Sequence, residues 1–254
     1  MSMARVALRV PPAGTVDVWT LPLPLPATVE SRLLRWLSRA ERDRLSRFVM
    51  DGPRRQFLAG RGAVRSLLAR YAGVTPREVR LTLGPKGKPC WEGGALAFNL
   101  SHSEGLLLVG ISSGLGLGVD VERIRPVAHA AQLLEHCFGP SESAAFENSS
   151  EGFLRAWVCK EAALKACGLG VADGWRRVQL QMQGRVEGRA CGAGQDGPVR
   201  ILQPGAGYVA AVAADRDPLT IRSLNPWGPR GLALLLQEMD DDYCNAGSVL
   251  ESSR

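Results

Sequence analysis

Several features that would assign this chain to a common class are missing from its sequence. No apolar run approaches the roughly 20 residues that a membrane-spanning helix needs, and the opening MSMARVALRV lacks the apolar core and cleavage site of a signal peptide. The six cysteines form no CxxC pair and have no histidine at zinc-ligand spacing. We therefore expect a cytoplasmic protein with reduced cysteines and no contact with a membrane.

Histidine is also scarce, which restricts the chemistry. The three histidines are His102, His129 and His136. The latter two fall in a helical pattern without metal-ligand spacing, and no Gly-x-Ser-x-Gly elbow is present to supply a hydrolase nucleophile for His102. A histidine metal site and a serine hydrolase of that type are both disfavoured.

The sequence does have enough apolar residues to form a core, and it has a net positive charge. Of 254 residues, 45% are hydrophobic, and 31 Lys and Arg outnumber 25 Asp and Glu, which favours a negatively charged partner such as nucleic acid, a phosphorylated cofactor or an acidic protein. Eleven arginines lie between Arg32 and Arg70, but few aromatic residues stand among them to stack on bases. We expect no nucleic-acid partner.

Hydrophobic periodicity gives a coarse map of elements. Two amphipathic helices are predicted over residues 31–49 and 54–73, and a hairpin from residues 106–112 and 115–122. The remaining predictions are strands at 5–10, 77–84, 96–103, 176–183, 198–202 and 207–214, an extended surface segment at 21–26, and helices at 128–137, 141–148, 153–167 and 230–239.

An internal similarity appears when the chain is compared with itself. FLAGRGAVRSLLARYAG, from Phe57, matches FLRAWVCKEAALKACGL, from Phe153. The match predicts an α/β (α+β) fold of two similar, pseudo-duplicated halves, residues 1–115 and 116–224, with a site between them and a tail, 225–254, of unknown role. The alternative is that any two amphipathic helices can match to this degree.

The stretch GVDVE, residues 118–122, places two carboxylates on one face of a strand. Residues i and i+2 point the same way, so Asp120 and Glu122 project together while Val119 and Val121 pack behind them. Carboxylate oxygens are ligands that Mg²⁺ prefers. The alternative is a strand end at which both acids reach water.

Two further constellations carry polar groups. In WVCKEAALK, Glu161 and Lys165 share a helix face, either as a surface ion pair or as an acid and a cation that border a cleft. In FNLSHS, residues 98–103, polar side chains end a strand. The GPKGKP loop, residues 84–89, adds glycines and lysines suited to an anion.

Taken in order, GPKGKP, FNLSHS, GVDVE and WVCKEAALK resemble the 4'-phosphopantetheinyl transferases of the surfactin-synthetase type, over roughly residues 40–215. The resemblance implies two similar α/β halves, each a long helix packed on a small, mainly antiparallel sheet, with coenzyme A and Mg²⁺, or Mn²⁺, in the cleft. It implies a monomeric enzyme that moves 4'-phosphopantetheine from coenzyme A to a serine of an apo acyl or peptidyl carrier protein.

The resemblance also implies roles for matching positions. Asp120, Glu122 and Glu161 match the metal ligands; Glu161 is the expected base, and Lys165 the cation at the pyrophosphate, while Lys160 matches the other lysine beside Glu161. The N-terminal half is expected to hold most nucleotide and phosphate contacts, and the C-terminal half the acids. The expected coenzyme A contacts are Arg61, Lys86, Lys88, Pro89, Asn99, Ser101, His102 and Lys165.

Two other functions remain open at this point. One is a non-catalytic protein that binds coenzyme A or a carrier protein, which would be expected to lack one of the three acids. The other is a basic nucleic-acid-binding protein, which would leave the acids unexplained.

Overall fold

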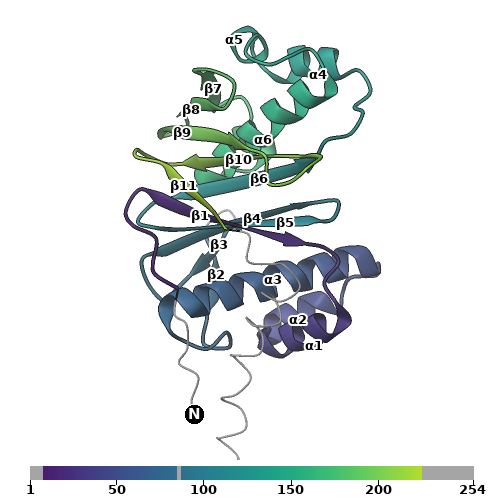
Figure 1. Cartoon of the computed structure of the whole chain (residues 1–254), viewed down its shortest axis with the longest axis vertical. Coiled ribbons are helices and arrows are strands. Elements are labelled where there is room, and N and C mark those ends of the chain that lie inside the picture. The colour runs from purple at the N-terminus through teal and green to yellow at the C-terminus, as the bar shows by residue number, and fades with distance from the viewer. Residues whose placement is uncertain (1–7, 85–86, 225–254) are drawn as a thin grey trace, which may run out of the picture. The chain divides into compact units, whose positions relative to one another are not determined.

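A computed structural model describes residues 8–84 and 87–224 of the chain, shown in Figure 1. The chain divides into two compact units. The first, here the helical unit, holds the described residues 8–9 and 24–79. The second, here the sheet unit, holds residues 10–23 and the described residues from 80 to 224. The predicted boundary at residues 115–116 falls inside the sheet unit, and the division into two halves stays a prediction.

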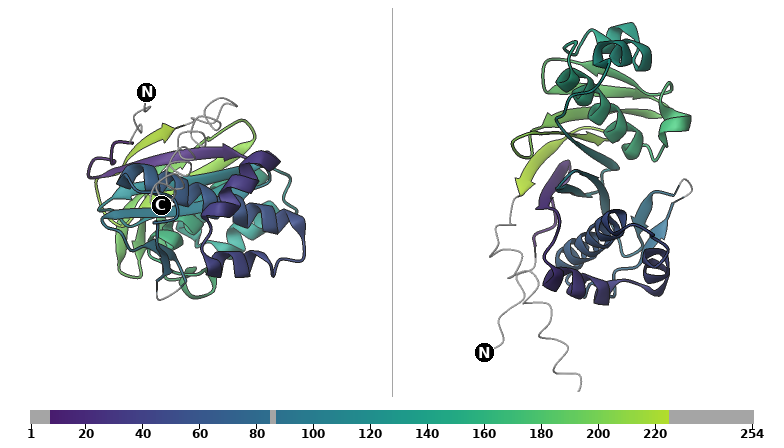
Figure 2. Two further views of the ribbon diagram at one scale, coloured as in Figure 1. Left: turned by 90° about the horizontal axis from the view of Figure 1, so that it is seen from below. Right: turned by 90° about the vertical axis from the view of Figure 1, so that its right-hand side faces the viewer.

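The helical unit consists of α1 (Ala27–Trp36), α2 (Arg39–Leu45) and α3 (Asp51–Ala72), which appear from two further sides in Figure 2. Helix α1 buries Leu33 against α3 at Gly62, where a β-carbon would lie only 2.7 Å from the Leu33 side chain. Glycine at this position therefore permits the close approach of the two helices. Helix α3 ends at Gly73, which adopts a left-handed φ of 69°.

The single helix predicted over residues 31–49 is divided into α1 and α2. Ser38 begins α2: its side chain accepts a hydrogen bond from Glu41 N, and Glu41 accepts one from Ser38 N. This capping box satisfies amide groups that a new helix start leaves without partners. The break was readable in the sequence, because Ser and Glu stand three residues apart.

The sheet unit contains two main sheets. The four-stranded sheet has the order β11-β1-β5-β4, with β1 parallel to β11 and the other pairs antiparallel. The five-stranded sheet is antiparallel throughout, in the order β6-β10-β9-β8-β7. The first sheet is built from β1 (Thr15–Pro22), β4 (Leu96–Ser103), β5 (Leu106–Ser113) and β11 (Thr220–Leu224). The second is built from β6 (Leu117–Arg123), β7 (Gln179–Met182), β8 (Glu187–Gly192), β9 (Gln195–Leu202) and β10 (Tyr208–Ala214). A small ribbon pairs β2 (Leu81–Leu83) with β3 (Pro89–Trp91).

Helix α6 (Ser150–Ala166) lies along the five-stranded sheet and contacts β6, β9 and β10. Gly118 of β6 allows the closest approach, because a β-carbon there would meet the carbonyl oxygen of Ala162 at 2.0 Å. The outer side of α6 is covered by α4 (Ala130–Cys137), and α5 (Pro140–Ser143) and α7 (Val171–Gly174) complete the layer.

The other face of β6 packs on the four-stranded sheet. Val119 and Val121 join an apolar cluster with Val16, Val18 and Leu108, all of them buried. Because α6 covers one face of β6 and the four-stranded sheet covers the other, β6 is enclosed on both sides.

The mixed α/β fold class expected from the sequence is confirmed. The predicted hairpin is wrong: residues 106–113 pair with β1 and β4, whereas residues 117–123 pair with β10. The expectation missed the strands β1, β3, β8 and β11 and the short helix α7, and residues 8–10 form no strand. The predicted helix at 230–239 and the rest of the tail lie outside the described residues. Among the helices that the structure describes, none combines the length and the apolar character needed to cross a bilayer.

Candidate active site at strand β6 and helix α6

Asp120 lies at the centre of the candidate site. It is 5% exposed, and its Oδ1 accepts hydrogen bonds from Ser101 Oγ at 2.7 Å and from Lys165 Nζ at 2.6 Å. The three residues come from β6, β4 and α6, so three elements meet at one carboxylate oxygen. Burial raises the pKa of Asp120, while the Lys165 ammonium and the Ser101 hydrogen bond oppose that rise.

Glu122, two residues further along β6, has its own partners. Its Oε2 accepts from Ser103 Oγ at 2.8 Å and from the Arg125 guanidinium at 2.9 Å. Ser103 stands two residues after Ser101 on β4, just as Glu122 follows Asp120 on β6. The alternation of strand side chains therefore sets two serines beside two acids.

Glu161 lies on α6, one turn before Lys165, and is partly buried. Burial raises its pKa; the Lys165 ammonium lowers it, and the negative charges of Asp120 and Glu122 raise it further. Asp120 and Glu122 are thus close enough to Glu161 for their charges to disfavour its ionisation. The site carries an excess of negative charge that a divalent cation would relieve.

Backbone amide and carbonyl groups along the outer edge of β6 form hydrogen bonds with side chains from other elements. Asn99 is buried and accepts a hydrogen bond from Val119 N at 2.9 Å, and Ser103 accepts one from Arg123 N at 3.1 Å. Lys165 also donates to Val119 O at 3.3 Å. Asn99, predicted as a coenzyme A contact, therefore joins β4 to β6 in this structure.

Lys88 points toward the same edge. Its ammonium donates to the carbonyl oxygens of Leu117, Lys165 and Ala166 at 2.8, 2.6 and 3.5 Å. Burial lowers the pKa of Lys88. This lysine, expected at a phosphate, connects the start of β6 to the end of α6.

Lys160 lies away from the acids. It is 1% exposed, and its ammonium donates to Glu142 Oε1 at 2.5 Å and to Val178 O at 2.6 Å, beside the rings of Phe138 and Trp175. Lys160 and Glu161 are neighbours in the sequence, but they face different surroundings of α6. Glu142 is a structural residue that the sequence reasoning missed.

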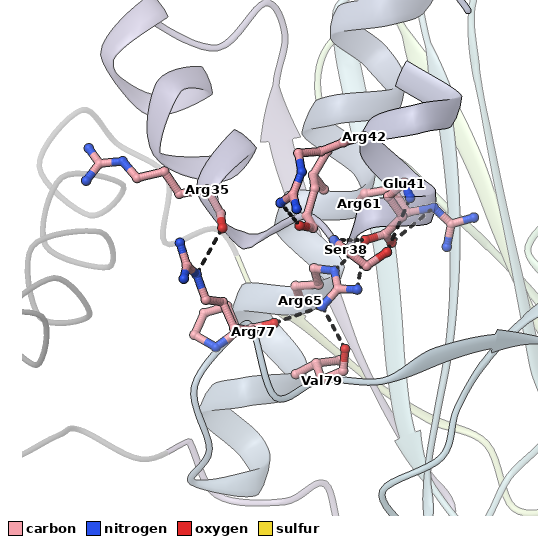
Figure 3. A network of polar contacts seen from close by, with 10 residues as sticks. Arg35, Ser38, Glu41, Arg42, Arg61, Arg65, Arg77 and Val79 are labelled. Carbon is pink, nitrogen blue, oxygen red and sulfur yellow. Dashed lines mark hydrogen bonds and ion pairs between the residues drawn. The ribbon is translucent and has the colours of Figure 1, made fainter. Parts of the chain in front are cut away.

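Arg61 belongs to the helical unit and takes part in the polar network of Figure 3. Its Nε lies 3.9 Å from Glu41 Oε1, and Arg65 binds Oε2 of the same carboxylate at 2.7 Å. Arg61 and Arg44 both lie over the ring of Phe57. Burial, Arg44 and Arg65 lower the pKa of Arg61, and Glu41 raises it. Around Arg61 positive charge exceeds negative charge, which suits an anion.

Three further residues were expected to contact coenzyme A. His102 is exposed on β4, and Pro89 begins β3. Lys86 lies outside the described residues. The missed neighbours are Ser103 and Arg125; Ser103 could have been found from its strand alternation with Ser101, whereas Arg125 follows β6 in a loop without a pattern.

The donor types at the site fit a hard divalent cation, because carboxylate oxygens of Asp120, Glu122 and Glu161 lie within electrostatic reach of one another. Their positions do not close around one point: in the described part of the chain, no three His, Cys, Asp or Glu side chains are grouped as a metal site. The Lys165 ammonium instead contacts Asp120. The assignment of a metal to these residues stays a prediction.

Comparisons with known proteins give the class. A model of the 4'-phosphopantetheinyl transferase superfamily matches residues 116–213, and a model of the N-terminal part of 4'-phosphopantetheinyl transferases matches residues 25–113. The chain belongs to the 4'-phosphopantetheinyl transferase superfamily. The narrower assignment to the surfactin-synthetase type stays a prediction.

Individual relatives agree with this class. The 4'-phosphopantetheinyl transferase HetI of Nostoc sp. is 38% identical over 166 residues, which cover 62% of this chain and 70% of HetI. Sfp of Bacillus subtilis is 24% identical over 200 residues, covering 75% of this chain and 88% of Sfp. AcpT of Salmonella typhimurium is 36% identical over 133 residues, covering 50% of this chain and 64% of AcpT.

Proposed function

We propose that this protein transfers the 4'-phosphopantetheine group of coenzyme A to a serine hydroxyl of an apo acyl or peptidyl carrier protein. The observation that carries the proposal is a cluster of three acids and one lysine in a chain of this superfamily. Lys165 binds Asp120, and Glu161 lies close enough to Asp120 and Glu122 to be affected by their charges. The serine oxygen forms a bond to the phosphorus that bears pantetheine. The bond from that phosphorus to the bridging oxygen breaks, and 3',5'-ADP leaves.

The residues of the site have separate tasks in this reaction. The Lys165 ammonium stabilises the negative charge that grows on the pyrophosphate as the bond breaks. Glu161 takes the proton of the serine hydroxyl; a raised pKa brings its basicity closer to neutral pH, where a general base is most effective. In the metal-free site, Ser101 and Asp120 hold the Lys165 ammonium in place.

Magnesium fits the same acids. Asp120, Glu122 and Glu161 would hold Mg²⁺ or Mn²⁺, and the ion would supply further positive charge for the phosphate oxygens. Binding requires the carboxylates to turn from their present partners toward a common point. The excess negative charge at the site supports this assignment.

The nucleotide of coenzyme A carries a 3'-phosphate that needs its own cations. Arg61 is proposed to contact it, and the positive charge around Arg61 supports this assignment. Exposed His102 is proposed as a second contact, and Ser101 as a contact to the pyrophosphate side. Lys86 and Pro89 stay predictions from the resemblance.

The test is direct. We incubate the protein with coenzyme A, Mg²⁺ and a panel of apo carrier proteins, and we measure by mass spectrometry whether a carrier gains one phosphopantetheine group. Gain of that mass by at least one carrier is expected, and it should disappear when the carrier serine is replaced by alanine. A panel without any modified carrier would overturn the enzymatic function in favour of a coenzyme A or carrier-binding protein. The comparisons give no support to that alternative or to nucleic-acid binding.

Other properties stay predictions. The carrier is proposed to present an acidic surface, which the net charge of +6 of this chain would attract. A cytoplasmic location and a monomeric state are carried over from the sequence analysis.

A further inference from the structure

Lys88 forms a bridge between the two elements that carry the acids and Lys165. Its Nζ lies 2.8 Å from Leu117 O, at the start of β6, and 2.6 Å from Lys165 O, in the last turn of α6. A third, longer contact of 3.5 Å reaches Ala166 O. One ammonium thus binds carbonyl groups of both elements.

These contacts use the bonding capacity of the ammonium. A lysine ammonium has three donors and no acceptor, and three carbonyl oxygens surround it here. Carbonyl groups at the end of a helix lack partners within the helix and attract a cation. A phosphate could be bound only if Lys88 gave up these carbonyls.

The bridge acts where α6 and β6 are closest. Gly118 follows Leu117, and a β-carbon on Gly118 would lie 2.8 Å from Lys165 Cβ. Lys165 in turn reaches Asp120 from the same turn of α6. The backbone of Lys165 is therefore bound through Lys88, while its side chain binds the acid.

We propose that Lys88 is a positioning residue, which fixes the end of α6 against β6 and thereby holds Lys165 at Asp120, instead of a ligand of the coenzyme A nucleotide. This revises the role expected for Lys88 from the sequence, and it rests on the proposed transfer reaction for its effect on turnover. Binding of the 3'-phosphate then depends on other cations.

Nucleotide affinities separate the two roles. We compare the dissociation constants of 3',5'-ADP and 5'-AMP, whose ratio measures what the 3'-phosphate contributes, and we measure kcat and KM for coenzyme A with the same carrier protein. The variants are Lys88→Met, which has similar length and no charge, and Lys88→Arg, which keeps a cation able to reach the carbonyls. Arg185→Met serves as control, because Arg185 is an exposed cation of the sheet unit paired with Glu147.

For Lys88→Met we expect kcat to fall about tenfold or more, since small displacements of reacting groups have large effects on rate, and the nucleotide ratio to change less than about twofold. Lys88→Arg should recover part of kcat, and Arg185→Met should match the wild type in both measurements. A ratio that falls about tenfold at unchanged kcat would mean that Lys88 binds the phosphate directly. Unchanged kcat in folded Lys88→Met would equally overturn the proposal.

Loss of folding in one variant does not prevent the test. If Lys88→Met fails to fold, Lys88→Arg and Lys88→Gln carry the comparison, with folding checked by circular dichroism. If the wild type binds 3',5'-ADP but modifies no carrier, the proposed function fails, while the nucleotide ratio still shows whether Lys88 contacts the 3'-phosphate.

Discussion

The Lys165 ammonium lies 2.6 Å from Oδ1 of Asp120, and this ion pair joins the last turn of α6 to the middle of β6. The carboxylate is 7% exposed and the lysine side chain 27% exposed. The carboxylate is therefore shielded from solvent while the ammonium stays partly accessible, as the proposed contact of Lys165 with a pyrophosphate requires.

Replacing Asp120 by asparagine should abolish transfer while leaving the protein folded. The amide keeps the size of the side chain and an acceptor for Ser101, but it removes the charge that holds Lys165 and that we propose to bind a metal. We expect kcat/KM for carrier modification to fall by at least about 100-fold. Glu161→Ala should do the same. Circular dichroism controls for folding, and turnover within tenfold of wild type at ordinary Mg²⁺ would refute the metal assignment.

The pKa of Glu161 gives a prediction about pH. Its folded-state pKa is raised above the ordinary 4.5 by burial and by the neighbouring acids, so the folded state disfavours the charged form. Its contribution to stability is present below pH 4.5 and is lost as pH rises through the raised value. Glu161→Gln should therefore raise the melting temperature of the metal-free protein near neutral pH, and this gain should vanish toward pH 4.5.

Thermal denaturation in EDTA across this pH range checks that prediction. Adding Mg²⁺ should give the wild type the higher melting temperature of the two, because the ion stabilises the wild type more than the variant. A melting temperature of Glu161→Gln that stays equal to wild type at every pH in EDTA would argue against the crowding of the three acids.

The buried pair of Lys160 and Glu142 should contribute to stability more than an exposed pair does. Lys160→Met leaves the Glu142 carboxylate buried beside Leu180 N without its cation, and we expect a loss of about 3–5 kcal/mol in the free energy of unfolding. The control is Arg185→Ala, which removes an ion pair whose side chains are 85% and 70% exposed. That loss should not exceed about 1 kcal/mol. Urea denaturation measures both, and equal losses would contradict the prediction.

A methyl group at Gly118 should disturb the contact between β6 and α6. The added carbon would lie 2.0 Å from Ala162 O and 2.5 Å from Ala166 N, both backbone atoms that cannot turn away. Gly118→Ala should cost about 1–3 kcal/mol or more and lower kcat, since Lys165 moves with α6.

Gly116→Ala is the matched control for that change. There the added carbon meets the Asp215 carboxylate at 2.9 Å, and a side chain end can move aside. A loss in Gly116→Ala as large as that in Gly118→Ala would mean that backbone contact is not the cause.

Local pattern predicted much of the site. Alternation along residues 96–103 gives β4 with its observed bounds, and the same rule puts Asp120 and Glu122 on one face of β6. Helical spacing puts Glu161 and Lys165 together on α6. These features depend on residues a few positions apart, where the backbone geometry decides the outcome.

Features set by distant contacts were not predictable. Strands β5 and β6 follow each other and read as a hairpin, but β6 pairs with β10, far along the chain. The contacts of the lysines also could not be predicted from local pattern. Lys88, Lys160 and Lys165 have the same side chain, and only tertiary packing decides that the first binds carbonyls, the second a buried glutamate and the third the acid of the site.

The enclosure of β6 has a consequence for the dynamics of the enzyme. With α6 on one face and the four-stranded sheet on the other, the strand cannot separate from either neighbour without exposing the apolar residues of the sheet unit. Amide hydrogens in β6 should therefore exchange with solvent only when the sheet unit as a whole opens. The backbone that carries the two acids of this strand then keeps its place through the small fluctuations of the native state, so that only their side chains need to turn when a ligand binds.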